Sequence, residues 1–297
     1  MNRILISLAI IGAVSAIVIG GTISYFSDTE TSSGNTFTAG SIDLKVDNEC
    51  SFNGKKCVCT DSTCTWEGTN EPCTCTWEEK DLGEGDLFFQ FSDIKPGDWG
   101  EDTISLHVKN NDAWACAAIR ITQNDDNTCV DPEIEAEGEG NCNNGQPSEN
   151  FDGELAQNLE FFFWADVCED EKGAVPGDNI YQPRCDKELM RGPVSAIIGN
   201  SSGPVTVVYT LADSQENNVG GDPGDPLEGS HTYYIGKAWC FGTINIDEQG
   251  NISCNGSSVG NEAQTDKVEG DIIFYAIQER NNDNFKCEDW NPLSPQG

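Results

Sequence analysis

The side chains that could do chemistry in this chain are mainly carboxylates. The sequence has 51 Asp and Glu residues against 16 Lys and Arg, which gives a formal net charge of −35. One group, interspersed with glycines after an apolar segment, has the oxygen ligands and loop flexibility that Ca²⁺ requires: Asp166, Glu169, Asp170 and Asp178. The group is a candidate calcium site, but it departs from the Asp-x-Asp-x-Asp-Gly pattern, so a solvated loop is the favoured interpretation. A second acidic stretch, residues 125–139, is the lesser candidate.

The second reactive set is the 14 cysteines, an even number that permits full pairing in an exported chain. The sequence does not give their connectivity. Six of them lie between residues 50 and 75, where Cys-x-Cys occurs twice. We favour a disulfide-stapled hairpin over a metal site, because zinc sites usually show Cys-x-x-Cys pairs. The disulfide candidates are Cys50, Cys57, Cys59, Cys64, Cys73, Cys75, Cys116, Cys129, Cys142, Cys168, Cys185, Cys240, Cys254 and Cys287.

The sequence offers no catalytic constellation. Its 2 histidines, His107 and His231, lie on or beside strand-like segments and are typical of solvent-facing strand residues. His-Glu-x-x-His, Gly-x-Ser-x-Gly and the glycine-rich nucleotide motifs are absent. Pairs of carboxylates are too common in so acidic a chain to identify a catalytic site. We therefore expect no catalytic residues and no enzyme, and the net negative charge argues against nucleic acid as a partner.

These side chains must be positioned by β-strands, because apolar and polar residues alternate along the chain with almost no helical periodicity. The strand-like segments are residues 42–46, 86–93, 104–108, 114–122, 159–165, 194–198, 205–211, 232–241 and 271–280. We expect one hairpin between residues 98–110 and 114–122, and another between 64–67 and 75–78. The pattern favours an all-β fold, an antiparallel jelly-roll-like β-sandwich with disulfide-stapled loop insertions.

The N-terminus has the features of an export signal. Arg3 precedes an apolar run, residues 4–19, that is shorter than the roughly 20 residues needed to span a bilayer. We predict a signal peptide at 1–24, with an uncleaved anchor as the alternative, and a single β-sandwich domain at 25–297. That domain has an N-terminal arm (25–40), a cysteine-rich hairpin insertion (48–80) and an acidic loop insertion (124–150). The protein would be secreted, extracellular or at the cell surface, touching a membrane only through an uncleaved signal segment.

Several stretches resemble a known family. Residues 25–30 (Tyr-Phe-Ser-Asp-Thr-Glu) and 35–44 (Asn-Thr-Phe-Thr-Ala-Gly-Ser-Ile-Asp-Leu) resemble the start of mature TasA/camelysin (CalY) proteins, which carry a SipW-type signal peptide. Residues 93–98 with 104–111 resemble the family's proline-glycine turn and following strand. Residues 238–242, 278–282 and 284–287 resemble its cysteine-rich members. The cysteine-rich hairpin and the acidic loops lie outside the resemblance.

The resemblance implies a jelly-roll subunit of extracellular fibres, in a biofilm matrix or in pilus-like filaments. Such fibres form by donor-strand exchange, in which the N-terminal arm of one subunit completes the sheet of the next. The implied partners are further copies of this chain, arranged head to tail, and a signal peptidase during export. The implied contact residues are Tyr25, Phe26 and Phe37.

Two other functions remain as alternatives to a fibre subunit. One is a monomeric or anchored calcium-dependent cell-surface binding module. The other is a metallopeptidase, since camelysin is classed as one. The sequence has no recognisable zinc motif, so that activity is not carried over from the family.

Overall fold

A computed structural model of the protein describes residues 27–31, 43–60, 63–82, 86–88, 91, 93–126, 130–137, 151–170 and 173–294. The predicted signal peptide, residues 1–24, lies outside these ranges. No helix in the described part of the chain is long and apolar enough to cross a membrane.

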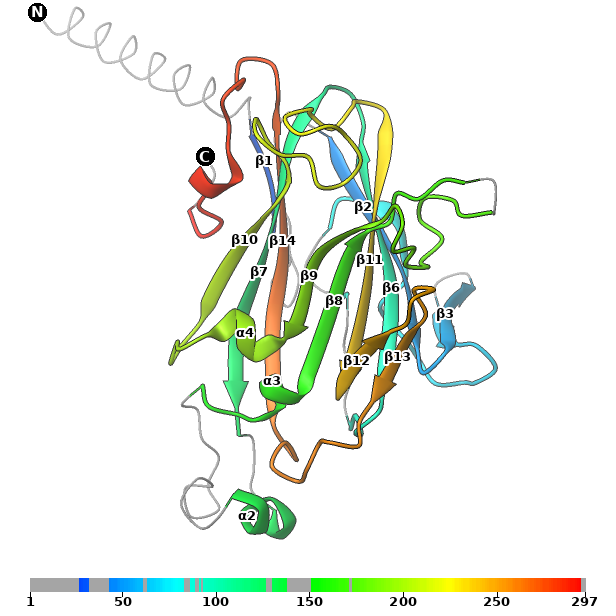
Figure 1. The fold of residues 1–297 in the computed structure, drawn as a ribbon, viewed down its shortest axis with the longest axis vertical. Coiled ribbons are helices and arrows are strands. Elements are labelled where there is room, and N and C mark those ends of the chain that lie inside the picture. The colour runs from blue at the N-terminus through cyan, green and yellow to red at the C-terminus, as the bar shows by residue number, and fades with distance from the viewer. Residues whose placement is uncertain are drawn as a thin grey trace, which may run out of the picture.

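Two antiparallel sheets form the body of the molecule (Figure 1). The first sheet has the order β1 (Ser27–Thr31), β14 (Lys267–Gln278), β7 (Ala113–Asp125) and β10 (Val205–Ala212). The second has the order β4 (Thr63–Trp66), β3 (Lys55–Thr60), β2 (Leu44–Phe52), β6 (Trp99–Val108), β11 (His231–Phe241), β8 (Leu159–Ala165) and β9 (Lys187–Pro193), and β5 (Trp77–Lys80) pairs with β2. A small ribbon joins β12 (Thr243–Ile246) to β13 (Ile252–Asn255).

The chain crosses between the two sheets at most steps. Strand β6 lies in the second sheet and β7 in the first, β8 and β9 return to the second, β10 crosses to the first, β11 to the second and β14 to the first. This alternation gives a jelly-roll-like sandwich. The predicted all-β fold class is confirmed.

The core lies between the sheets and is built from the alternating apolar residues of the long strands. Ile104 and Leu106 of β6 are fully buried, as Ile235 of β11 and Phe274 of β14 nearly are. Strand β8, with the sequence Leu-Glu-Phe-Phe-Phe-Trp-Ala, is buried on both faces from Phe161 to Ala165, as its run of apolar residues predicts.

Both predicted hairpins are wrong. Strand β6 pairs with β2 and β11, whereas β7 pairs with β10 and β14 in the opposite sheet. Strand β4 pairs with β3, and β5 pairs with β2. Alternation identified most of these strands, but it carries no information about the sheet to which a strand belongs.

Some local assignments also differ from the sequence prediction. Residues Val194–Ile198 form the short helix α4 rather than a strand, directly after β9, which the sequence did not indicate. The described residues of 86–93 form no strand. Helix α3 (Leu155–Asn158) is a single short turn, and α2 (Asp131–Glu137) lies where a loop was expected. A 3₁₀ turn at Cys287–Asp289 ends the regular structure.

Twelve of the cysteines form disulfide bonds, as predicted. The pairs are Cys50–Cys75, Cys57–Cys73, Cys59–Cys64, Cys116–Cys287, Cys168–Cys185 and Cys240–Cys254. Cys129 and Cys142 lie outside the described residues. Five of the six bonds close local loops, whereas Cys116–Cys287 joins residues 171 apart and fixes the C-terminal segment to β7.

A buried ion pair interrupts the apolar core. Lys237 Nζ of β11 lies 2.7 Å from Asp102 Oδ2 of β6, and the two side chains are 0% and 1% exposed. Asn48 Nδ2 of β2 donates to the same carboxylate at 3.3 Å. Burial lowers the pKa of Lys237 and raises that of Asp102, while each partner's charge opposes the shift of the other. The two groups therefore depend on one another inside the sandwich.

Replacing one member of this pair should destabilise the fold strongly. The substitution Lys237→Met leaves the buried Asp102 carboxylate without its cation, so we expect a loss of about 3–5 kcal/mol in the free energy of unfolding. Urea unfolding followed by tryptophan fluorescence measures it. The double variant Lys237→Met/Asp102→Leu should recover most of the loss, and an equal loss in both variants would contradict the coupling.

Candidate functional site

The first candidate site is the edge of the first sheet where the N-terminal arm pairs with β14. Strand β1 runs antiparallel to β14, with Ser27 opposite Ile277 and Thr31 opposite Ile273. Among the described strands, β1 pairs with β14 alone. Strand β14 has β7 on its other side, so it would become an open sheet edge if β1 were absent.

The side chains of β14 are covered on both faces along this edge. Phe274 and Ala276 point into the core between the sheets. Ile273 and Tyr275 belong to a separate cluster on the outer face and are 1% and 4% exposed. A pairing strand therefore contacts β14 chiefly through main-chain N–H and C=O groups, which is the basis of strand addition.

The C-terminal segment covers the outer face beside this edge. Cys287 is bonded to Cys116 of β7, and the Trp290 ring stacks on Tyr275 with ring centroids 5.1 Å apart and planes at 17°. Figure 1 shows this segment in red next to β1 and β14. The disulfide thus holds the C-terminal segment against the outer face of β14 independently of β1.

The arm residues predicted to make the contact, Tyr25, Phe26 and Phe37, lie outside the described residues, and their contacts stay a prediction. What the structure describes is β1, which lies between them in the sequence. The strand expected at residues 42–46 is the beginning of β2, which runs on to Phe52. Leu44 and Val46 of β2 are buried in the core, so β2 is a strand of this chain's own sandwich.

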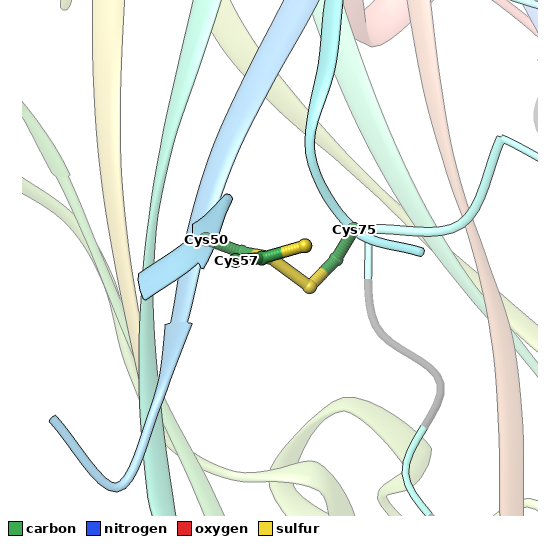
Figure 2. Close-up of side chains that lie close together, drawn as sticks. All are labelled: Cys50, Cys57 and Cys75. Atoms are coloured by element: carbon green, nitrogen blue, oxygen red, sulfur yellow. A yellow bond between two sulfur atoms is a disulfide. The ribbon is translucent and has the colours of Figure 1, made fainter. Parts of the chain in front are cut away.

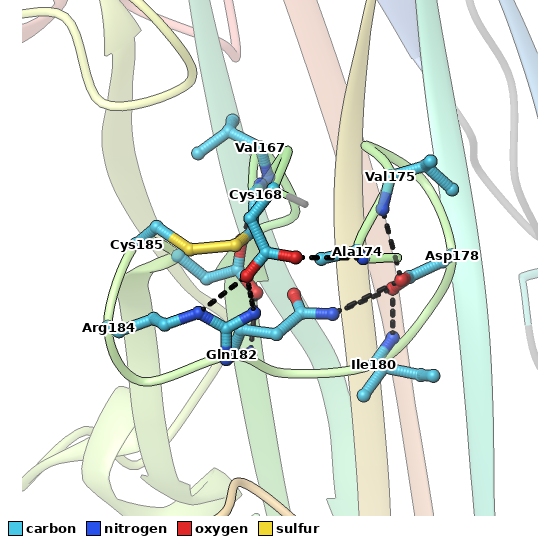
Figure 3. The surroundings of a disulfide bond; sticks show 11 residues. Val167, Cys168, Ala174, Val175, Asp178, Ile180, Gln182, Arg184 and Cys185 are labelled. Atoms are coloured by element: carbon cyan, nitrogen blue, oxygen red, sulfur yellow. Dashed lines mark hydrogen bonds and ion pairs between the residues drawn. A yellow bond between two sulfur atoms is a disulfide. The ribbon is translucent and has the colours of Figure 1, made fainter. Parts of the chain in front are cut away.

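Three of the predicted calcium ligands, Glu169, Asp170 and Asp178, lie in the loop closed by Cys168–Cys185, and Asp166 comes two residues before it. Asp178 accepts hydrogen bonds from the main-chain N–H of Val175 and of Ile180, at 3.3 and 2.9 Å (Figure 3). Asp170 accepts from Ala174 N and Arg184 Nε, and Asp166 accepts from Asn179 N within the loop. Glu169 is exposed. Their oxygens form no compact group of three among the described residues, and calcium binding here stays a prediction.

One of these carboxyl groups has a strongly shifted pKa. Burial raises the pKa of Asp166 to about 7, and the hydrogen bond from Asn179 N partly offsets that shift. Because the folded-state pKa lies above the unfolded value, the folded protein holds a proton that the unfolded chain releases. The contribution of Asp166 to the free energy of unfolding is therefore lost as the pH rises through 7.

The cysteine-rich hairpin does not offer thiolates. Cys50, Cys57 and Cys75 lie close together (Figure 2), but each is paired in a disulfide, to Cys75, Cys73 and Cys50 respectively. A sulfur in a disulfide is not the thiolate that a metal needs. The predicted disulfides, rather than a metal site, match this arrangement, although the strands that they join are paired differently from the prediction.

The two histidines make ordinary strand contacts. The His107 Nε2 atom lies 2.6 Å from Asp47 Oδ2, and its Nδ1 lies 3.0 Å from Thr232 Oγ1. His231 packs against the ring of Tyr233, with centroids 4.9 Å apart. Within the described part of the chain, the side-chain groups with metal-binding spacing contain no histidine.

A third group of close ligand atoms was not singled out from the sequence. It combines Asp126, Glu133 and Asp266. The first two belong to the acidic stretch 125–139, but Asp266 is far away in sequence and nothing in its local pattern marks it. Burial raises the pKa of Asp266 to about 8, and the charges of Asp126 and Glu133 act in the same direction. These three carboxyl groups are therefore close enough to interact strongly.

The pH dependence that burial of Asp166 gives the fold can be tested with Asp166→Asn. The variant keeps an oxygen that can accept from Asn179 N but has no charge to bury, so it should be more stable than wild type at pH 9 by on the order of 2–4 kcal/mol, and this advantage should be less than half as large at pH 5. Urea unfolding at both pH values measures the difference. A difference that is the same at pH 5 and pH 9 would contradict the assigned shift.

Comparison with known proteins bears on the N-terminal part of the chain. Residues 3–63 match the family model described as camelysin metallo-endopeptidase. No curated protein and no solved structure matches the chain. The matched range contains β1, β2 and β3, and so includes the arm and the first strand of the sandwich. The match confirms the resemblance of this chain to the TasA/camelysin family.

Proposed function

We propose that this protein is a secreted structural subunit of extracellular fibres that polymerises by donor-strand exchange. The observation that carries the proposal is the pairing of β1 with β14 at the edge of the first sheet. A strand from a second copy can satisfy the same main-chain groups, so pairing within one chain can be exchanged for pairing between chains. The family match, which includes the arm, and the disulfides, which suit an exported chain, support the proposal.

The contact that results is open-ended. It joins the arm of one copy to the β14 edge of the next, and these are two different surfaces. A head-to-tail contact between unlike surfaces can repeat without closing, which produces a filament. The net charge of −35 opposes the approach of copies, so polymerisation should be favoured by ionic strength, which screens exposed charges beyond about 10 Å at 0.1 M salt.

Deleting residues 25–37 from the mature chain tests this function. The deletion removes β1 and the predicted contact residues of the arm but leaves the apolar core of the sandwich. We therefore expect a folded monomer that forms no filaments. Electron microscopy shows filaments, size-exclusion chromatography with light scattering gives the mass, and circular dichroism reports the fold. Filaments that persist after the deletion would contradict the proposal.

A peptide control removes the ambiguity of a deletion that fails to fold. A synthetic peptide of residues 25–38, added in excess to the full-length mature protein, should occupy the β14 edge and shorten the filaments. A scrambled peptide of the same composition should have no effect. Full-length protein that stays monomeric in every condition would favour the calcium-dependent binding module instead.

Peptidase activity is the second candidate, because the matched family is described as a metallo-endopeptidase. The assay is hydrolysis of casein by purified protein loaded with Zn²⁺, repeated with the variant His107→Ala/His231→Ala. Metal-dependent hydrolysis that the variant loses would establish a peptidase. A fibre subunit without this activity should give the same background rate in both proteins.

A further inference from the structure

We propose that Asp126, Glu133 and Asp266 form a calcium-binding site, with Asn124 as a further oxygen ligand, at the end of the sandwich where β7 finishes and β14 begins. The inference does not depend on fibre formation. The arm pairs with residues 273–277 near the other end of β14. Helix α2, which carries Glu133, lies beyond this end of the two strands (Figure 1).

The strand register brings two of the carboxylates together. Asn124 pairs with Val268 and Asp125 with Lys267 across β7 and β14. Continuing this antiparallel ladder by one residue sets Asp126 opposite Asp266, on the same sheet face, because paired residues share a face. No local sequence pattern relates these two positions.

The third carboxylate comes from α2 and meets the other two at a spacing that suits one cation. The ligand oxygens of Asp126, Glu133 and Asp266 all lie within 4.8 Å of one another. Two oxygens bound to the same Ca²⁺ at 2.3–2.6 Å can be at most about 5 Å apart. One ion can therefore contact all three groups without a large rearrangement.

Hydrogen bonds hold these carboxylates in place. The Glu133 Oε2 atom accepts from Val130 N at 3.1 Å and from Thr265 Oγ1 at 3.2 Å. The Asp266 Oδ2 atom accepts from Leu155 N at 2.7 Å. These donors bind one oxygen of Glu133 and one oxygen of Asp266. They fix the orientation of both carboxylates, as the outer partners of metal ligands do.

An independent observation points to a ligand at this position. The side chain of Asn124 is 4% exposed, and its Oδ1 atom is buried without a hydrogen-bond donor. Asn124 lies two residues before Asp126, so strand alternation directs both side chains to the same face. The Oδ1 atom of Asp266 is likewise buried without a donor. Leaving a buried acceptor unsatisfied is costly, and a bound cation removes that cost.

The donor set selects the class of metal. Every proposed ligand is a carboxylate or amide oxygen, and neither a thiolate nor an imidazole belongs to the group. Hard oxygen ligands suit Ca²⁺, which accepts 6–8 of them in flexible geometry, whereas zinc sites usually include nitrogen or sulfur. A bound ion would neutralise the buried carboxylates and link α2 to the ends of β7 and β14.

The experiment compares calcium binding by the mature protein and by matched variants. After treatment with EGTA and dialysis, wild type is titrated with CaCl₂ by calorimetry, and its thermal unfolding is recorded with and without 1 mM Ca²⁺. We expect one calcium per chain from this site and a rise in Tm on the order of 5 °C. The variant Asp126→Asn/Asp266→Asn should lose both responses. The control Asp170→Asn/Asp178→Asn, in the Cys168–Cys185 loop, should keep them.

Three outcomes would overturn the site. The first is that the wild-type protein binds no calcium at millimolar concentration. This result would exclude the site even if a variant fails to fold. The second is a calcium response that survives in Asp126→Asn/Asp266→Asn, because the ion would then bind elsewhere. The third is an equal rise in Tm with Mg²⁺ in wild type and in the variant, which would indicate general screening of the net charge of −35.

Discussion

The structure depends on one constraint: the main chain of β14 must be paired on both sides. Strand β14 runs through the first sheet with β7 on one side, and its side chains are buried on both faces. Pairing with β1 satisfies its remaining main-chain groups over five residues. An apolar strand with an open edge is a template for any extended chain, and β1 covers the side of β14 that β7 leaves unpaired.

The rest of the molecule keeps this edge well defined. The Cys116–Cys287 bond fixes the C-terminal segment over the outer face of β14, and the core clusters hold its inner face. The Lys237–Asp102 pair lies in the other sheet and restricts how β6 and β11 can be aligned, because a shifted register would separate two buried charges. In the Cys168–Cys185 loop, main-chain amides bind the carboxylates of Asp170 and Asp178.

The sequence was most informative about local properties, although residues 194–198 form a helix where a strand was expected. Alternation located β2, β10, β11 and β14 and the buried run of β8, and the cysteine count indicated disulfides. Sheet membership was not local, because the chain crosses from one sheet to the other after β6, where the short polar joint suggested a hairpin. The carboxylate cluster could not be identified from the sequence for the same reason, because Asp266 reaches Asp126 only through the pairing of β14 with β7. Within the Cys168–Cys185 loop, composition showed the carboxylates but not the main-chain amides that bind them.

The long disulfide also has a mechanical meaning. Cys116 and Cys287 are 171 residues apart in the sequence, and the segment between them includes β8, β9, β10, β11 and β14. In a fibre built by strand exchange, tension enters a subunit through the arm and leaves through β14, inside the covalent loop. Most of the sandwich therefore cannot be drawn out into an extended chain while that bond is intact. In such a fibre the antiparallel β1–β14 ladder would lie along the direction of pull, and its hydrogen bonds would share the load in shear. The joints between copies, rather than the folded chains themselves, would then set the strength of the fibre.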